Sequence, residues 1–308
     1  MTEADDTGLR NRIFGAGAAV AIAVGALIAF HAGAAEAPAD PKAAWEASLA
    51  DYNAHVATER IATLKIDDAI YLKPGEDAAL VCEAKHCHWQ LGLPRNRTLF
   101  EVSYDGKTAI ARPGGVDLLK AEGPTSVSPT LDVTANEAQI EPGKMGLRVT
   151  VFNQDNPKAA AFAGVDYFPY NPDFIIEAAF EPLPAPEPHD FQTSRGWWKR
   201  FYRVGFAVFA REGHAVRLPL YAGGTTAEDM KSLSAFFTDA HTGTETYGVG
   251  RYVDAELESF PQATVTLDFN YAYNPACAIS PHFNCPVAED DLPFAVTAGE
   301  RKPKGADH

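Results

Sequence analysis

Beyond about residue 64, apolar residues alternate with polar ones, and Gly, Pro, Asn and Asp separate the alternating runs. In one such run, Phe100, Val102 and Tyr104 occupy every second position, and Asp105-Gly106 follows directly before the next run. A period of two is that of a β-strand, and Asp-Gly between two alternating runs is the strongest short-range signal of a β-hairpin. Most of the chain is therefore expected to form strands.

The pattern recurs at residues 146–152, 174–180, 204–210, 214–221, 234–238, 245–253 and 264–273. No helical pattern separates these runs, so they predict a mainly β fold, an antiparallel sandwich or barrel. A proline-rich run at residues 182–188 is either a stiff linker between domains or a long connection within one sheet system. Neither half has a self-contained set of elements. We therefore predict a single β domain over residues 65–300 and a disordered tail over 301–308.

One helix is expected before the strands, over residues 40–64. Asp40-Pro41 supplies an N-cap followed by proline at the first helical position. The apolar residues that recur at helical spacing are Trp45, Leu49, Tyr52 and Val56. This amphipathic stripe is expected to pack against a sheet; the alternative is a helix that binds a partner.

The first 37 residues resemble an export signal. Arg10 and Arg12 precede an apolar run over residues 13–30, and two small-x-small sites follow, Ala32-Gly33-Ala34 and Ala35-Glu36-Ala37. The apolar run approaches the length that crosses a bilayer, so the segment is either a cleaved signal peptide or an uncleaved anchor. The folded part is accordingly predicted to be periplasmic or secreted, or held at the inner membrane facing outward.

The four cysteines are best interpreted in that oxidising setting. An even number favours disulfide bonds, and the simplest pairing joins Cys82 to Cys87 and Cys277 to Cys285. The segment from Cys82 to His88 is also the one obvious metal-binding motif, but its spacing matches no strong zinc signature. We therefore predict disulfide bonds, no metal and no cofactor.

Charge limits the partners. The formal net charge is −15 and the isoelectric point is about 5.0, which argues against nucleic acid because phosphate binding requires clustered Lys and Arg. No polybasic run is present to hold a membrane surface, which leaves the N-terminal segment as the expected membrane contact. A small molecule is the expected partner.

Polar side chains concentrate on two of the predicted strands. In residues 264–273, Asp268 and Asn270 share a face, and in residues 245–253, Tyr247 and Arg251 share one. Pairing of the two strands would bring Arg251 towards Asp268. The pair could be a buried ion pair that fixes the register, or a clamp for an anionic or carbonyl group with Tyr247 as a second donor.

A turn precedes these strands. Asp239 and Thr242 are expected to bond the backbone there, with Gly243 at positive φ. His241 is interpreted as an exposed residue of this turn rather than as a general base.

The same region resembles a bacterial and archaeal family of uncharacterised proteins, known only as a domain of unknown function. The residues that carry the resemblance are Phe237, Asp239, Thr242, Gly243, Glu245, Thr246, Tyr247, Gly248, Gly250, Arg251, Tyr252, Asp268, Phe269, Asn270, Ala272, Tyr273, Asn274, Pro275, Cys277, Cys285, Pro286, Leu292, Pro293, Ala298, Gly299 and Glu300. Departures from the family pattern fall at His241, Ala276, Asp291 and around Arg148. The resemblance implies a mostly β fold and no particular activity.

No complete catalytic signature is present: the chain has no Gly-x-Ser-x-Gly elbow, no Gly-rich phosphate loop and no His-Glu-x-x-His. We predict an exported β domain that binds a small anionic or carbonyl-bearing ligand through Asp239, Tyr247, Arg251, Asp268 and Asn270. One alternative is a hydrolase in which Asp268 or Asp239 is the general base, and Arg251 and Tyr247 stabilise developing negative charge. A second alternative is a structural protein of the cell envelope.

Overall fold

The computed structural model describes residues 40–83, 86–94 and 98–304. The predicted export segment, residues 1–37, lies outside the described residues. Within the described part of the chain, no helix is long and apolar enough to cross a membrane. The fold is mainly β and antiparallel with one long N-terminal helix, as predicted.

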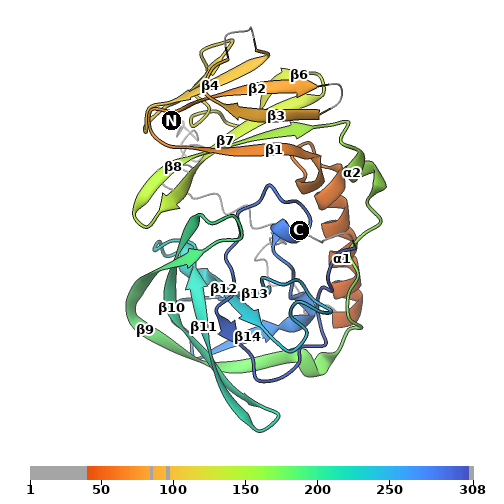
Figure 1. Ribbon diagram of the computed structural model, residues 1–308. Coiled ribbons are helices and arrows are strands. Elements are labelled where there is room, and N and C mark those ends of the chain that lie inside the picture. The colour runs from red at the N-terminus through yellow and green to blue at the C-terminus, as the bar shows by residue number, and fades with distance from the viewer. Residues whose placement is uncertain (1–39, 84–85, 95–97, 305–308) are drawn as a thin grey trace, which may run out of the picture.

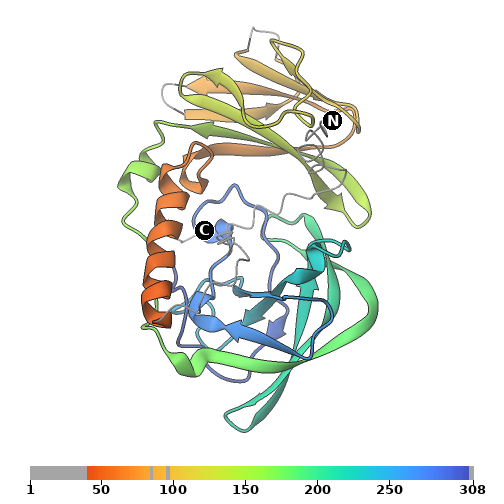
Figure 2. The ribbon, with the colours of Figure 1, turned by 180° about the vertical axis from the view of Figure 1, so that it is seen from behind.

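Helix α1 (Pro41–Thr58) begins where the sequence indicates. The Asp40 side chain accepts a hydrogen bond from the Lys42 backbone N–H at 3.0 Å, which caps the helix. Trp45, Tyr52 and Val56 are buried, whereas the opposite side of the helix is exposed. Figures 1 and 2 show α1 running along one side of the molecule, beside both of its β bodies.

The first β body contains two four-stranded antiparallel sheets (Figure 1). One sheet has the order β1-β8-β7-β6, with β1 (Ile66–Leu72), β6 (Thr125–Ser128), β7 (Leu131–Glu141) and β8 (Lys144–Asn153). The other has the order β3-β2-β4-β5, with β2 (Asp77–Glu83), β3 (His86–Leu91), β4 (Phe100–Tyr104) and β5 (Ala109–Arg112). Apolar residues of both sheets share one core, which makes this body a sandwich. The predicted hairpin at Asp105-Gly106 joins β4 to β5.

The second body is one strongly curved sheet with the order β13-β12-β11-β10-β9-β14 (Figure 2). Its strands are β9 (Ile175–Gln192), β10 (Trp198–Arg211), β11 (His214–Ala222), β12 (Ser232–Thr238), β13 (Arg251–Glu256) and β14 (Thr264–Asp268), and the short β15 (Asp290–Asp291) pairs in parallel with β12. Tyr252 and Tyr273 exchange two backbone hydrogen bonds of 2.9 Å. This bridge joins β13 to the segment after β14, so the sheet closes into a near-barrel.

Short helices occupy the connections. They are η1 (Thr63–Lys65), α2 (Pro157–Ala161), η2 (Pro172–Phe174), η3 (Asp229–Lys231), η4 (Phe269–Tyr271) and η5 (Ala276–Ala278). A separate core cluster contains residues of α1, of both β bodies and of the loop that carries Cys277 and Cys285. The two bodies therefore meet through buried apolar contacts, and their description as a single domain over residues 65–300 stays a prediction.

The proline-rich run is neither a linker nor a connection, because it lies within β9. Pro182 pairs with Gly205 and Glu187 pairs with Arg203, so the residues between them form a long bulge. The neighbouring strand β14 pairs with β9 only as far as Ala179. The prolines thus lie on an edge of the sheet, where a missing N–H removes no ladder bond.

Two predicted strands are shorter than expected. Of the run at residues 245–253, only the part from Arg251 belongs to β13, because the φ of Gly250 is +94° and interrupts the extended backbone. Glycine is required at this position, since an added Cβ would lie 2.6 Å from the Phe237 carbonyl oxygen. The run at residues 264–273 ends as a strand at Asp268, whose side chain accepts from the Asn270 N–H at 2.9 Å and caps η4. Local side-chain and backbone bonds there replace the sheet ladder.

The first residues of the predicted tail form backbone hydrogen bonds with the fold. The Arg301 N–H donates to the Asp166 carbonyl at 2.8 Å, and the Lys302 N–H donates to the Glu245 carbonyl at 2.8 Å. Residues 305–308 lie outside the described residues.

Candidate functional site

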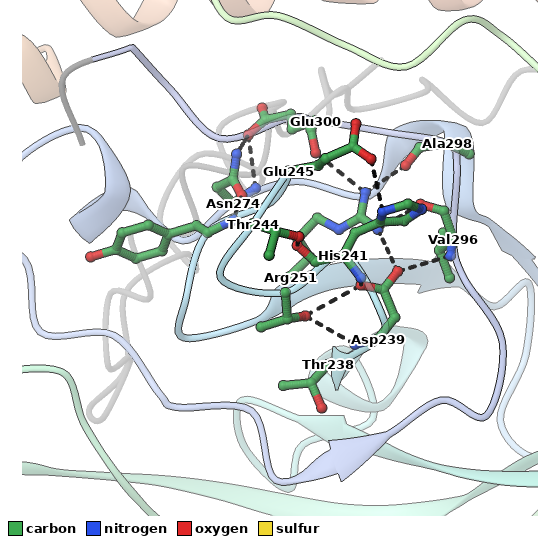
Figure 3. A network of polar contacts seen from close by, with 12 residues as sticks. Thr238, Asp239, His241, Thr244, Glu245, Arg251, Asn274, Val296, Ala298 and Glu300 are labelled. Carbon is green, nitrogen blue, oxygen red and sulfur yellow. Dashed lines mark hydrogen bonds and ion pairs between the residues drawn. The ribbon is translucent and has the colours of Figure 1, made fainter. Parts of the chain in front are cut away.

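Arg251 lies in a closed network of polar contacts and is 1% exposed (Figure 3). Its guanidinium donates to Asp239 Oδ2 at 3.0 Å and to the carbonyl oxygens of Val296 at 2.8 Å, Ala298 at 2.5 Å and Glu300 at 3.2 Å. The Arg251 side chain therefore fastens the C-terminal segment to the start of β13. The expectation that Arg251 pairs with Asp268 is wrong.

Asp239 is the actual partner, and its side chain is fully enclosed. Oδ2 also accepts from the Val296 N–H at 2.9 Å, and Oδ1 accepts from the His241 N–H at 3.1 Å. A carboxylate held by an arginine and two backbone donors has no free lone pair directed at solvent. His241, which was expected to be exposed, is instead half-buried beside Glu245, with 3.1 Å between Nδ1 and Oε1.

The other predicted site residues form hydrogen bonds within the fold. The Asn270 side chain is buried, accepts from the Asn171 N–H at 2.8 Å and donates to the Asn171 carbonyl at 3.0 Å. Asp268 accepts from the Asn270 side chain at 2.8 Å and is half-buried. The Tyr247 hydroxyl donates to the Cys277 carbonyl at 3.4 Å inside the core. The five predicted residues therefore do not line a common open cleft.

Sequence reasoning missed Glu300 as the centre of this region. Its Oε2 accepts from the Asn274 N–H at 2.7 Å and from the Asn274 side chain at 3.1 Å, and its Oε1 accepts from the Tyr167 hydroxyl at 3.1 Å. Burial, the largest cause, raises the pKa of Glu300 to about 7, although these hydrogen bonds oppose the shift. The one available signal was the Ala298-Gly299-Glu300 motif within the family resemblance.

The cysteines are only partly as predicted. Cys82 and Cys87 form a disulfide between directly paired positions of β2 and β3. Cys277 and Cys285 are buried thiols without a sulfur–sulfur bond, although the Cys277 N–H donates to Cys285 Sγ at 3.4 Å. Spacing correctly placed the second pair close together but could not determine its oxidation state. Among the described residues, no group of three or more His, Cys, Asp or Glu side chains is arranged to hold a metal ion.

A cleft of about 560 Å³ lies between the two β bodies. Its walls include Tyr71, Met145, Arg148, Lys199, Phe283 and Asn284. They come from β1 and β8 of the sandwich, from β10 of the near-barrel and from the loop that carries the cysteine thiols. Clefts between packed bodies are a common place for small-molecule sites. The cationic residues of this cleft were not predicted as site residues.

Arg148 projects into this cleft from β8, where it pairs with Tyr71 of β1. It is 7% exposed, and its guanidinium lies 5.0 Å from the ring centre of Phe283. Nη2 donates to the His282 carbonyl at 3.1 Å, whereas the buried Nε has no hydrogen-bond partner among the described residues. Burial, the largest cause, lowers the pKa of Arg148 from its ordinary value, whereas the side chains of Tyr71 and Cys285 act in the opposite direction.

Lys199 approaches the same cleft from β10 and is half-buried. Its Nζ lies 5.2 Å from the ring centre of Phe201, and no carboxylate of the described chain is within ion-pair distance. Burial, the largest cause, lowers the pKa of Lys199; Arg148 acts in the same direction, and the Cys285 thiol opposes them. The cleft thus combines two cations that lack acidic partners, in a chain whose formal charge is −15.

Comparison with known proteins finds a family similarity in the second body. Residues 160–301 match the model of the family described as protein of unknown function DUF1684. The match covers the near-barrel and the C-terminal network, but it starts after Arg148 and the sandwich.

Among solved structures, the chain is similar to an uncharacterised protein of Haloarcula marismortui whose structure was determined by solution NMR. The two are 34% identical, with 46% of this chain and 78% of that chain covered and a TM-score of 0.40. No curated protein matches the chain.

Proposed function

We propose that this protein is an exported binding protein for a small anionic molecule, and that the ligand occupies the cleft between the two β bodies with its anionic group on Arg148. The observation that carries the proposal is the buried Nε of Arg148, which has no partner among the described residues and belongs to a side chain of the cleft wall. Buried polar groups are almost always hydrogen-bonded in the functional state. An anion in the cleft supplies the missing acceptor.

The cleft composition supports an anion that also has an apolar portion. Lys199 adds a second positive charge, and the Asn284 side chain lies on the same wall. Tyr71, Met145 and Phe283 add apolar and aromatic surface. The wall is therefore mixed, with polar groups that can orient a ligand and apolar surface that can cover the rest of it. The proposed ligand is of the anionic class expected from the sequence. The proposed binding site, however, is the cleft at Arg148 and not the predicted residues around Arg251.

Export is part of the proposal and rests on two observations. The first is the N-terminal segment, with Arg10 and Arg12 before an apolar run. The second is the Cys82–Cys87 disulfide, because disulfides persist mainly in oxidising compartments. The mass of the mature N-terminus, measured on protein from its native host, distinguishes a cleaved signal from an uncleaved anchor. A cytoplasmic protein with an intact N-terminus would contradict export.

No specific observation favours the hydrolase alternative. A general base must reach a water molecule or a substrate proton, and the Asp239 side chain is 0% exposed and held by Arg251. Asp268 is committed to capping η4. The envelope-protein alternative remains the outcome to accept if no ligand binds.

Calorimetric titration with small carboxylates and with inorganic phosphate tests the proposal. Arg148→Gln should weaken binding of the best ligand at least about tenfold, since a hydrogen bond to a charged group contributes roughly 1.5–3 kcal/mol. Arg217→Gln is the matched control. Arg217 is exposed, does not line the cleft, and pairs with Glu181, with 2.9 Å between Nε and Oε2. Equal affinities of the folded Arg148 variant and the control would refute the assignment, as would a panel without any binding.

A further inference from the structure

Lys199 departs from the ordinary behaviour of a lysine in a folded protein. The residue is half-buried, lines a cleft and has no carboxylate within ion-pair distance among the described residues. The acidic residues of the cleft wall are Glu137 and Asp229. Asp229 is occupied by the backbone N–H and the hydroxyl of Thr226, at 2.9 and 2.6 Å. No ion pair joins Glu137 to Lys199 in the described part of the chain, and the lysine shares the cleft with a second cation, Arg148.

Such surroundings lower the pKa of the Lys199 amine, so its neutral form is more accessible than that of an ordinary lysine. Removal from water disfavours the charged form, and Arg148 disfavours it further. A neutral amine has a free lone pair and is a nucleophile towards carbonyl carbon. If Lys199 served only as a second positive charge for an anion, a more exposed or better-hydrated position would retain that charge more readily.

We propose that Lys199 forms a reversible imine with the carbonyl group of a small keto acid whose carboxylate is bound by Arg148. The inference rests on the proposed function, because Arg148 must hold the anionic end for the carbonyl to meet the amine. It narrows the ligand class from small anions to keto acids. It also joins the two halves of the sequence expectation, an anionic group and a carbonyl group, in one molecule.

The bond changes balance without an oxidant or a reductant. The Lys199 Nζ lone pair attacks the carbonyl carbon, the C–N bond forms, and the electrons of the C=O π bond move to oxygen, which takes a proton. Nitrogen loses its first proton and gives a neutral carbinolamine. Nitrogen then expels the hydroxyl group, which leaves as water after protonation, and loses its second proton to give the neutral imine. The sum is one amine and one ketone converted to one imine and one water.

The position of the amine and the guanidinium makes this arrangement geometrically reasonable. Arg148 and Lys199 come from different β bodies and both line the cleft, so one molecule between them can contact both. Phe283 supports the Arg148 guanidinium, and Phe201 lies beneath Nζ of Lys199. Side chains held against aromatic rings lose little further freedom when a ligand binds.

Reductive trapping tests the proposal directly. The full chain is incubated with pyruvate or with 4-oxopentanoate in the presence of sodium cyanoborohydride, and intact mass and peptide mapping locate any adduct. We expect one stable adduct per chain, on Lys199. Lys199→Arg should abolish it, and Arg148→Gln should reduce its rate at least tenfold at a fixed ligand concentration. Lys231→Arg is the control, because Lys231 is exposed and paired with Glu228 at 3.3 Å.

The outcomes separate this inference from the proposed function. If pyruvate and its hydroxy analogue lactate both bind in an Arg148-dependent manner and no adduct forms, the imine is refuted and anion binding stands. If neither ligand binds and adducts are spread over exposed lysines, both ideas fail. An adduct on Lys199 that is indifferent to Arg148→Gln shows a reactive amine without the proposed anchor, and overturns the keto-acid assignment.

Discussion

Replacement of Glu300 by glutamine should remove a pH dependence of stability that the wild-type protein shows near neutrality. Glu300 is 1% exposed and accepts three hydrogen bonds, two from Asn274 and one from the Tyr167 hydroxyl. A glutamine amide fits the same positions: its oxygen accepts from Asn274, and its NH₂ group donates to the Tyr167 oxygen. The variant thus imitates the protonated carboxyl while it keeps the side-chain volume.

The expected magnitude follows from the two pKa values of Glu300. Its pKa is about 7 in the folded protein against an ordinary pKa of 4.5, so the folded state favours the protonated form. This stabilisation is fully present below pH 4.5 and is lost as the pH rises through 7. At about 1.4 kcal/mol per pKa unit, the wild type should lose about 3 kcal/mol in total, most of it between pH 5 and 8.

Urea denaturation at pH 5, 6, 7 and 8 measures this loss. The stability of Glu300→Gln relative to wild type should rise with pH by about 2–3 kcal/mol across that range. Glu181→Gln is the control, because Glu181 is an exposed partner of Arg217 and should give a constant difference. Parallel curves for wild type and Glu300→Gln would refute the reasoning, since they would mean that Glu300 is ionised in the fold throughout.

Three further outcomes are expected. Arg251→Met should lower the free energy of unfolding by about 3–5 kcal/mol because it leaves a buried carboxylate uncompensated, whereas Arg203→Met, which breaks an exposed pair, should cost less than about 1 kcal/mol; urea denaturation compares them. Lys199→Met should raise the free energy of unfolding by about 1 kcal/mol, and with it the melting temperature, because it removes a desolvated amine without a carboxylate partner in the described chain. A lower melting temperature would contradict this. Alkylation of the denatured protein without reductant should label two thiols, assigned by mass spectrometry to Cys277 and Cys285, and a different count would contradict the cysteine arrangement.

Local features of the fold could be predicted from the sequence because they depend on neighbouring residues. The N-cap at Asp40, the Asp105-Gly106 hairpin and the Cys82–Cys87 bond each involve residues close in the chain. The prediction failed where local bonds compete with the sheet. Residues 239–250 form a turn-rich loop because Asp239 and Thr242 bond nearby backbone groups, while alternation alone suggested a strand over its second half.

The site residues were harder to predict because their partners are distant in sequence. Alternation identifies which face of a strand a residue occupies, but it does not identify the segment that covers this face. Arg251 was assigned to Asp268 on that basis, and its partners are instead Asp239 and the C-terminal carbonyl groups. Arg148 and Lys199 belong to different bodies, so their common cleft depends on how those bodies meet. No pattern within either strand contains that information.

The two buried cationic sites differ in what surrounds them, and this difference is the main reason to place function at the cleft. Nε of Arg251 also lacks a partner among the described residues, but its two Nη atoms make four hydrogen bonds in a closed interior. Those bonds account for Arg251 as a fastening of the C-terminal segment. Arg148 bonds one carbonyl oxygen, interacts with the Tyr71 side chain, and lines a cleft that also contains Lys199. Uncompensated cations cost stability, and they persist where a ligand completes them. If Lys199→Met is more stable than the wild type and no longer forms an adduct with a keto acid, the Lys199 side chain lowers the stability of the fold and is required for the reaction with the ligand.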